Sequence, residues 1–141
     1  ILTISAKNDS SFKIMVKRFF ESAQNIGDDA LRDFCYTANT GRGHFNIRMA
    51  LLVESCEDLV KKLEIVSQMK DYEILDNSME NWYFYGKHKL VSEKKDKNSD
   101  GEITEEEKKL LEKELDGLIN LSLASNGYNK EFLIKIGKFY K

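Results

Sequence analysis

The chain has 141 residues, 41% of them hydrophobic and 33% charged, which suits one folded domain with one core and excludes a disordered or fibrous protein. Its formal charge of −2, with acidic and basic residues interspersed, excludes a broad basic surface, so we expect no nucleic-acid partner and no membrane partner. The longest apolar run, 49–53, is too short to span a bilayer, and no charged-then-apolar leader opens the chain. We therefore expect a cytoplasmic protein, cut from something longer.

The first elements in chain order are a strand and a helix. Residues 1–6 are strand-like, and Asp9 or Ser10 can cap the helix that follows, which Gly27 ends. Apolar residues recur along this helix at steps of three and four, so one face is predicted to be buried: Phe12, Met15, Val16, Phe19, Phe20 and Ala23.

A second helix and a second strand come next. The helix starts at Asp28 or Asp29, turns Leu31, Phe34 and Cys35 inward, and ends near the two glycines of "NTGRG". The run "HFNIRMALLVES" then alternates, which predicts a strand with Phe45, Ile47 and Met49 facing inward before it becomes wholly apolar. Such a strand becomes more deeply buried from its first residue toward its last.

The remaining elements are a helix, a strand and two closing helices. Ser55 and Asp58 form a capping box ahead of an apolar stripe made of Leu59, Val60, Leu63, Val66 and Met69. "WYFYG" is aromatic and bounded by Gly86, which is typical of a strand. Residues 87–100 are read as a polar loop, and 104–124 and 130–140 as helices separated by "SNGYN". The pattern predicts an α/β (α+β) fold with a C-terminal helical pair, formed by one domain over 1–141.

The stretch "DKNSDGEITEEE", 96–107, matches a twelve-residue calcium loop, with candidate ligands Asp96, Asn98, Asp100, Glu102 and Glu107. Three observations weigh against a metal. Thr104 and Glu107 also form a capping box, the preceding "SEKK" lacks the apolar end of an incoming helix, and the chain has no second such loop. We favour a solvated loop with no metal and no cofactor, and keep a calcium-binding EF-hand-like module as the alternative.

No set of catalytic residues stands out. Cys35 and Cys56 lack a paired spacing, so both are interpreted as small buried thiols. His44 lies beside Arg42 without a recognisable Cys or Ser partner, and His88 lies in the polar loop. The chain also lacks the Gly-x-Ser-x-Gly elbow of an acyltransferase. We therefore expect a part without catalytic activity of its own.

A resemblance to a known family rests on "FCYTANTGRGHFNIRMALLVES". This stretch is similar to the linker region, also called the flanking subdomain, that follows ketosynthase domains in modular polyketide synthases. There, Tyr-Thr-x-x-x-Gly-Arg-x-His-x-x-x-Arg leads into a strand. The matching residues, called the signature residues below, are Tyr36, Thr37, Gly41, Arg42, His44 and Arg48. Three further stretches resemble other parts of that subdomain: "ILTISAK" (1–7), "YFYGKHKLVSE" and "KEFLIKIGKFYK". The resemblance therefore covers essentially the whole chain. The form seen here, with "ANTGRGHFNIR" and a long helical stretch before the last helix, looks most like that of synthases whose acyltransferase acts in trans, as a separate protein.

The resemblance implies a fold, a role and partners. The implied fold is a small three-stranded sheet covered by helices, packed beside its own ketosynthase, with 1–7 as the end of the ketosynthase's last strand. The implied role is structural, through lateral contact between neighbouring flanking subdomains or, alternatively, docking of a trans-acting acyltransferase. The lateral element of that family is a helical stretch, and here it corresponds to 104–140.

The helical pair independently suggests a partner, because its leucines spread over more than the stripe that a one-sided surface helix needs. One reading is that the last helix covers them within one subunit, and the other is lateral self-association. Both stay open. The candidate interface residues are Leu110, Leu111, Leu115, Leu118, Ile119, Leu121, Phe132, Ile136 and Phe139.

Overall fold

The computed structural model describes residues 1–41, 43–72, 81–87, 109–110, 113–114, 116–117, 120 and 130–140. Residues 139 and 140 are described by their backbone alone. The elements are β1 (Leu2–Ala6), α1 (Asp9–Ala23), the 3₁₀ turn η1 (Asp28–Ala30), α2 (Leu31–Thr40), β2 (Ile47–Leu51), α3 (Cys56–Ser67), β3 (Tyr83–Lys87) and α5 (Lys130–Tyr140).

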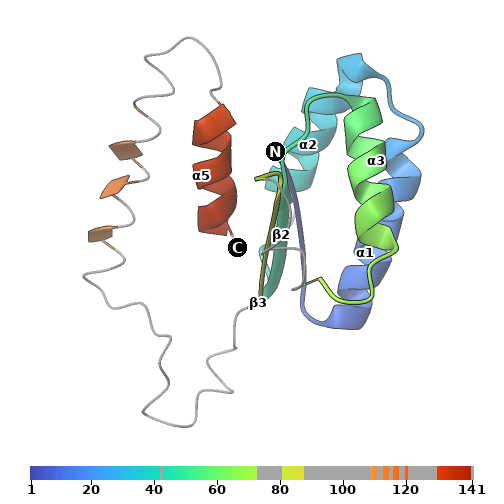
Figure 1. The fold of residues 1–141 in the computed structure, drawn as a ribbon, viewed down its shortest axis with the longest axis horizontal. Coiled ribbons are helices and arrows are strands. Elements are labelled where there is room, and N and C mark those ends of the chain that lie inside the picture. Colours follow the sequence, from blue (N-terminus) through green and yellow to red (C-terminus); the bar gives the residue numbers. More distant parts are fainter. Residues whose placement is uncertain are drawn as a thin grey trace, which may run out of the picture.

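The three strands form one antiparallel sheet in the order β1-β2-β3, with β2 in the centre. Leu2 lies opposite Leu51 and Ala6 opposite Ile47, while Leu51 also lies opposite Tyr83. Figure 1 shows the sheet standing between α5 on one side and α1, α2 and α3 on the other. The expected small three-stranded sheet covered by helices is therefore confirmed.

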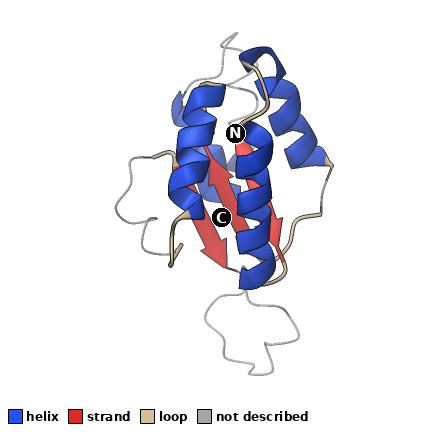
Figure 2. Ribbon diagram, turned by 90° about the vertical axis from the view of Figure 1, so that its right-hand side faces the viewer, coloured by secondary structure: helices blue, strands red, loops and turns tan. Residues whose placement is uncertain are grey.

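The larger core lies between the sheet and the helices α1 and α3, which Figure 2 shows lying in front of the strands. Successive side chains of a strand point to opposite faces, so every second strand residue reaches this core. They meet the apolar stripes of the two helices. The fully buried members include Leu2, Ile4, Phe12, Val16, Met49, Leu51, Leu59, Leu63 and Val66. Burying each of these side chains stabilises the fold by roughly 1.5–3 kcal/mol relative to leaving it exposed.

The opposite face of the sheet has a second, smaller core that α5 covers. Ala50, Leu52 and Phe84 are buried there, with Leu133 and Ile134 of α5 packed against them. Gly137 is buried in the same contact, and a Cβ at this position would overlap the Phe84 ring. The glycine therefore lets the helix approach the sheet closely.

Of the two helix caps predicted from the sequence, one is at the expected residue and the other is not. Ser55 caps α3 as expected, because its Oγ accepts a hydrogen bond from the Asp58 backbone N–H at 3.1 Å. The cap of α1 is Asn8, whose Oδ1 accepts from the Ser11 N–H at 2.8 Å, so the expectation of Asp9 or Ser10 was wrong by one or two residues. An asparagine in extended backbone geometry places its side-chain oxygen over the first turn equally well.

The predicted inward position of Phe45 is wrong, because its ring is 38% exposed. The pairing of β2 begins at Ile47, so the alternation that places Ile47 and Met49 inward does not extend back to Phe45.

The last predicted helix, 130–140, is present as α5. Between 104 and 124, every residue that the structure describes is helical. The predicted loop over 87–100 was wrong at Lys87, which is the last residue of β3 and lies opposite Ile47. Residues 88–100 and the turn at "SNGYN" lie outside the described residues. Among the described helices, none is both long and apolar enough to cross a membrane.

Candidate functional site

The signature residues gather around the connection between α2 and β2. Tyr36 and Thr37 are on the last turns of α2, Gly41 caps its end, His44 lies in the connection, and Arg48 is on β2. Arg42 lies outside the described residues. The structure thus brings the described signature residues into one local segment at the end of a helix.

Gly41 is required by a close approach rather than by an unusual backbone angle. Its φ is −82°, an ordinary value, and its N–H donates to the Thr37 carbonyl oxygen at 2.9 Å. A Cβ at Gly41 would lie 2.8 Å from that same oxygen. A larger residue would therefore push the helix end open.

The described signature side chains contribute little to the core. Tyr36 is 68% exposed, and Thr37 and His44 are exposed as well. Arg48 is half-buried and its Nε donates to the Phe45 carbonyl oxygen at 3.0 Å, which ties the connection to the start of β2. This segment presents an aromatic ring, a hydroxyl and an imidazole to the surroundings of the domain.

Asn39, which the sequence reasoning missed, closes the free edge of β1. Its Oδ1 accepts from the Thr3 N–H and from the Thr3 hydroxyl, both at 2.8 Å, and its Nδ2 donates to the Ile1 carbonyl oxygen at 3.0 Å. The amide therefore bonds to β1 much as a neighbouring strand would. Covering an edge in this way protects it from pairing with another chain.

The same edge is held further along by Ser5. Its hydroxyl donates to the Gly43 carbonyl oxygen at 3.0 Å and accepts from the Phe45 N–H at 3.3 Å. The 43–45 segment is thereby fixed against β1. Lys7 lies next to it, with its Nζ 5.3 Å from the centre of the Phe45 ring, a cation–π geometry.

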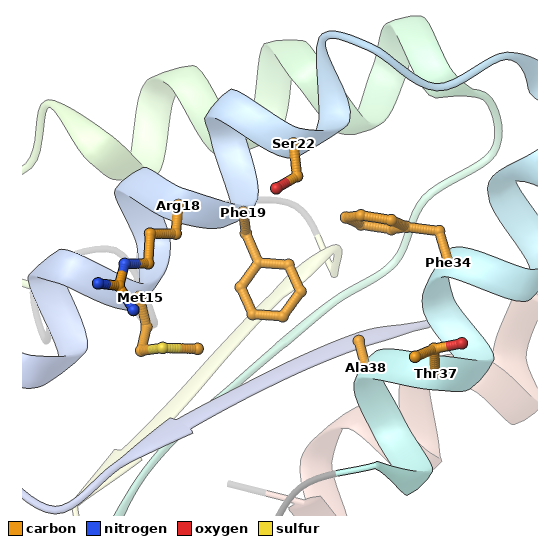
Figure 3. Close-up of a pocket in the computed structure, with 7 residues that line it drawn as sticks. All are labelled: Met15, Arg18, Phe19, Ser22, Phe34, Thr37 and Ala38. Carbon is orange, nitrogen blue, oxygen red and sulfur yellow. The ribbon is translucent and has the colours of Figure 1, made fainter.

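A groove runs along α1 and will be called the α1 groove. Its first part is a hollow of about 180 Å³ between α1 and α2, shown in Figure 3 and lined by Met15, Arg18, Phe19, Ser22, Phe34, Thr37 and Ala38. Its second part is a hollow of about 410 Å³ lined by Ser5, Ala6, Lys7, Asn8, Ser11, Met15, Gly43 and Phe45. A third, small space beside His44 shares Phe19 and Ala38 with the first hollow and Ser5 and Gly43 with the second, and Met15 lines all three spaces, so they lie next to one another.

The two thiols are buried and unpaired, as the sequence predicted. The Sγ of Cys56 donates to the Gly27 carbonyl oxygen at 3.2 Å, and the Cys56 N–H donates to Asp28 Oδ1 at 2.7 Å. Burial raises the pKa of Cys35, and burial followed by the nearby Asp28 side chain raises the pKa of Cys56. Both groups therefore stay protonated, and a protonated thiol is a poor nucleophile.

The candidate calcium ligands, Asp96 to Glu107, lie outside the described residues, so this alternative stays a prediction. In the part of the chain that is described, His, Cys, Asp and Glu do not gather into a group of three or more that could hold a metal ion.

The candidate lateral interface is described only in part. Leu110 is 66% exposed on its helix, and Phe132 and Ile136 of α5 are half-buried. The other candidates, Leu111, Leu115, Leu118, Ile119, Leu121 and the side chain of Phe139, lie outside the described residues. The other described residues between 109 and 120 are helical, exposed and mostly polar: Lys109, Lys113, Glu114, Asp116, Gly117 and Asn120.

Comparisons with known proteins bear on the region that contains the signature residues. Residues 1–63 match the family described as CurL-like, PKS C-terminal. Non-reducing polyketide synthase crz7 of Cladonia metacorallifera is 38% identical over 64 residues, and polyketide synthase PksR of Bacillus subtilis is 34% identical over 64 residues. Each match covers 45% of this chain but only 3% and 2% of those proteins, so the chain spans a very small part of their length.

Solved structures share the fold over almost the whole chain. The ketosynthase from module 6 of the bacillaene synthase from Bacillus subtilis 168 matches with a TM-score of 0.54 and 25% identity, covering 98% of this chain and 20% of that one. A mutant of the same ketosynthase matches with a TM-score of 0.51 and 22% identity, covering 94% of this chain and 24% of that one. The arrangement of sheet and helices described above therefore also occurs as a minor part of a longer chain.

Proposed function

Because the comparisons confirm the resemblance to a ketosynthase-associated C-terminal domain of polyketide synthases, we propose that this chain is a non-catalytic scaffold subdomain of a cytoplasmic polyketide synthase of the trans-acyltransferase type. It packs beside its own ketosynthase through the signature segment. Its C-terminal helices mediate lateral association between neighbouring synthase chains.

The exposure of Tyr36 supports the proposed contact between the signature segment and the ketosynthase. A tyrosine that is 68% exposed adds little to the stability of its own domain, whereas tyrosine is enriched in contacts between proteins because its ring is apolar and its hydroxyl polar. Tyr36 follows Phe34 by two residues, which turns it roughly 200° around α2, away from the groove that Phe34 lines. It is therefore available to a neighbour on the far side of the helix.

The exposure of Leu110 supports the second half. A leucine 66% exposed among charged side chains contributes apolar area only if another chain covers it. An isolated contact of this kind is weak, but many copies held in one assembly gain avidity through their effective concentration. Docking of a trans-acting acyltransferase is the alternative use of the same subdomain.

The non-catalytic role is supported by the state of the ionisable groups. The buried thiols have raised pKa values, and the exposed His44 does not share a pocket with either cysteine. The described residues therefore offer no paired thiol and imidazole.

Sedimentation velocity over a wide concentration range, with and without millimolar calcium, tests the lateral role. We expect a concentration-dependent dimer that is indifferent to calcium. A monomer at every concentration would favour acyltransferase docking instead. A calcium-dependent change that is lost in the Asp96→Ala, Glu107→Ala variant would establish the calcium-binding alternative.

Packing against the ketosynthase is tested separately by hydrogen exchange. The amides of residues 36–48 should exchange more slowly when the chain is joined to the ketosynthase of its parent synthase than when it is alone. Equal exchange in both states would contradict the proposed contact.

A further inference from the structure

The α1 groove shares one wall, between Thr37 and Phe45, with the segment proposed above to contact the ketosynthase, but its other wall is α1, and its lining points to a partner of its own. We propose that it binds an acidic, extended protein segment that places one apolar side chain beside Met15, one carboxylate near Lys7 and one near Arg18.

The floor of the groove is apolar and of a suitable size. Met15 lies at its centre, with Phe19, Phe34 and Ala38 in the part between the helices and Ala6 and Phe45 in the other part. The larger hollow, about 410 Å³, falls in the range of pockets that hold a ligand-sized group. It has room for one phenylalanine or leucine side chain.

The charges along the groove have one sign. Lys7 lines one hollow and Arg18 the other, and the other polar lining residues, His44 aside, are Thr3, Ser5, Asn8, Ser11, Ser22 and Thr37. Among the described lining residues, none carries a carboxylate. On a chain with a formal charge of −2, this local excess of positive charge is complementary to an acidic partner.

The walls of the groove are held in place before any partner binds. The 43–45 wall is fixed by the two hydrogen bonds of Ser5. On the helical side, the Phe19 and Phe34 rings make a T-shaped pair with centres 5.8 Å apart and planes at 89°. A groove that is already formed loses less conformational entropy on binding.

The spacing of the two cations sets the geometry of the partner. Arg18 lies nine residues after Asp9, the first residue of α1, which corresponds to about 14 Å at a rise of 1.5 Å per residue, and Lys7 precedes the helix by two residues. An extended chain covers about 16 Å in five residues. The fitting segment therefore has two acidic residues five positions apart and an apolar residue between them.

Titration of the isotope-labelled 141-residue chain with a capped decapeptide of this pattern, two glutamates five positions apart with one phenylalanine between them, tests the proposal by NMR. We expect saturable shifts of amides along the groove, such as those of Lys7, Met15 and Ala38, below about 1 mM peptide. Raising the salt from 50 to 500 mM should weaken the binding severalfold, because the charges are exposed.

Charge reversal provides the matched controls. Arg18→Glu and Lys7→Glu should each weaken binding about fivefold, and the double variant about 25-fold, because the two sites are too far apart to couple. Lys13→Glu changes an exposed lysine of α1 that does not line the groove and should change the affinity less than twofold. A peptide with lysines in place of the glutamates should bind the double variant better than the wild type.

Several results would overturn the proposal. Binding that is equally strong for a peptide with glutamines in place of the glutamates would remove the role of the cations. Shifts that fall outside the groove, or an equal loss in Lys13→Glu and Arg18→Glu, would place the peptide elsewhere. Broadening of the groove amides with chain concentration alone would show that a second copy occupies it.

Discussion

Gly137 of α5 lies directly against the ring of Phe84 on β3, at a position where a Cβ would overlap the ring. This contact joins the last helix to the sheet across more than forty residues of chain. It makes the second, smaller core sensitive to a single methyl group.

Gly137→Ala should therefore destabilise the domain, although alanine is the better helix former. Overpacking of a filled core costs typically 1–3 kcal/mol, more than the roughly 1 kcal/mol that alanine adds to a helix. Gly117→Ala is the control, because a Cβ at Gly117 meets nothing within 4 Å, and it should be neutral or stabilising. Urea unfolding of both variants measures the difference. Equal midpoints for the two would show that α5 does not pack on Phe84.

Asn39→Ala should open the edge of β1. The change removes three hydrogen bonds to Ile1 and Thr3 at once, so we expect a loss of about 1–3 kcal/mol and faster exchange of the Thr3 amide. Asn25→Ala, which removes one exposed bond to the Glu21 carbonyl oxygen, is the control and should have little effect on either measurement. Slow exchange of the Thr3 amide in Asn39→Ala would contradict the edge-closing role.

Two neighbouring lysines of α3 should differ sharply in their importance. Lys62 is bonded to Asp58 at 2.6 Å and to the Leu52 carbonyl oxygen at 2.8 Å, and its Nζ is 5.4 Å from the centre of the Trp82 ring. The side chains of this ion pair are only 15% and 30% exposed, against 67% and 79% for Lys61 and Glu57.

Lys62→Met should therefore lower the free energy of unfolding by about 1–2 kcal/mol, because a half-buried carboxylate and a carbonyl lose their donor. Lys61→Met should leave the urea midpoint unchanged, since solvent screens an exposed pair. An equal effect of the two substitutions would mean that burial does not decide the strength of these ion pairs.

The buried thiols predict a loss of stability at alkaline pH. The folded chain holds the pKa of Cys35 and Cys56 above the ordinary thiol value, so folding favours their protonated forms. This contribution is fully present below about pH 8.5, the pKa of an unfolded thiol, and is lost as the pH rises through the higher folded values. Urea midpoints between pH 7 and 9.5 should fall more in the wild type than in a Cys35→Ala, Cys56→Ala variant. Parallel curves would show that the thiols do not cause the loss.

Leu110→Glu should weaken lateral association, because it replaces an exposed apolar side chain by a charge. Lys113→Glu changes another exposed, helical residue three positions further along the chain and is the matched control. Sedimentation velocity should show a dimer for the control and mostly monomer for Leu110→Glu, as for Leu118→Glu, a change at another candidate interface residue. If both leucine variants still form dimers, the lateral interface does not depend on Leu110 or Leu118.

The sequence predicted most of the described elements because their apolar residues follow the period of the helix or strand they form. Phe12, Val16 and Phe19 recur as a helix requires, and Ile47 and Met49 alternate as a strand requires. Phe45 continues the same alternation but precedes the first paired residue, and a one-dimensional pattern does not contain the point at which pairing begins.

The candidate surfaces were less accessible to sequence reasoning. Asn39 lies within the signature run, but its role depends on Thr3, which is 36 residues earlier in the chain and reaches it only through the fold. The α1 groove likewise arises where Met15 and Phe19 of one helix face Ala38 of another. Such spaces are set by the distance between two packed elements, which periodicity does not give.

The separation between β3 and α5 has a consequence for the newly made chain. β3 ends at residue 87 and α5 begins at 130, so 43 further residues must be added before the covering helix can start to form. At about 5–20 residues per second, this takes roughly 2–9 seconds on the ribosome. During that interval α5 does not cover Ala50, Leu52 and Phe84, so the nascent sheet lacks the helix that buries this apolar face in the finished domain.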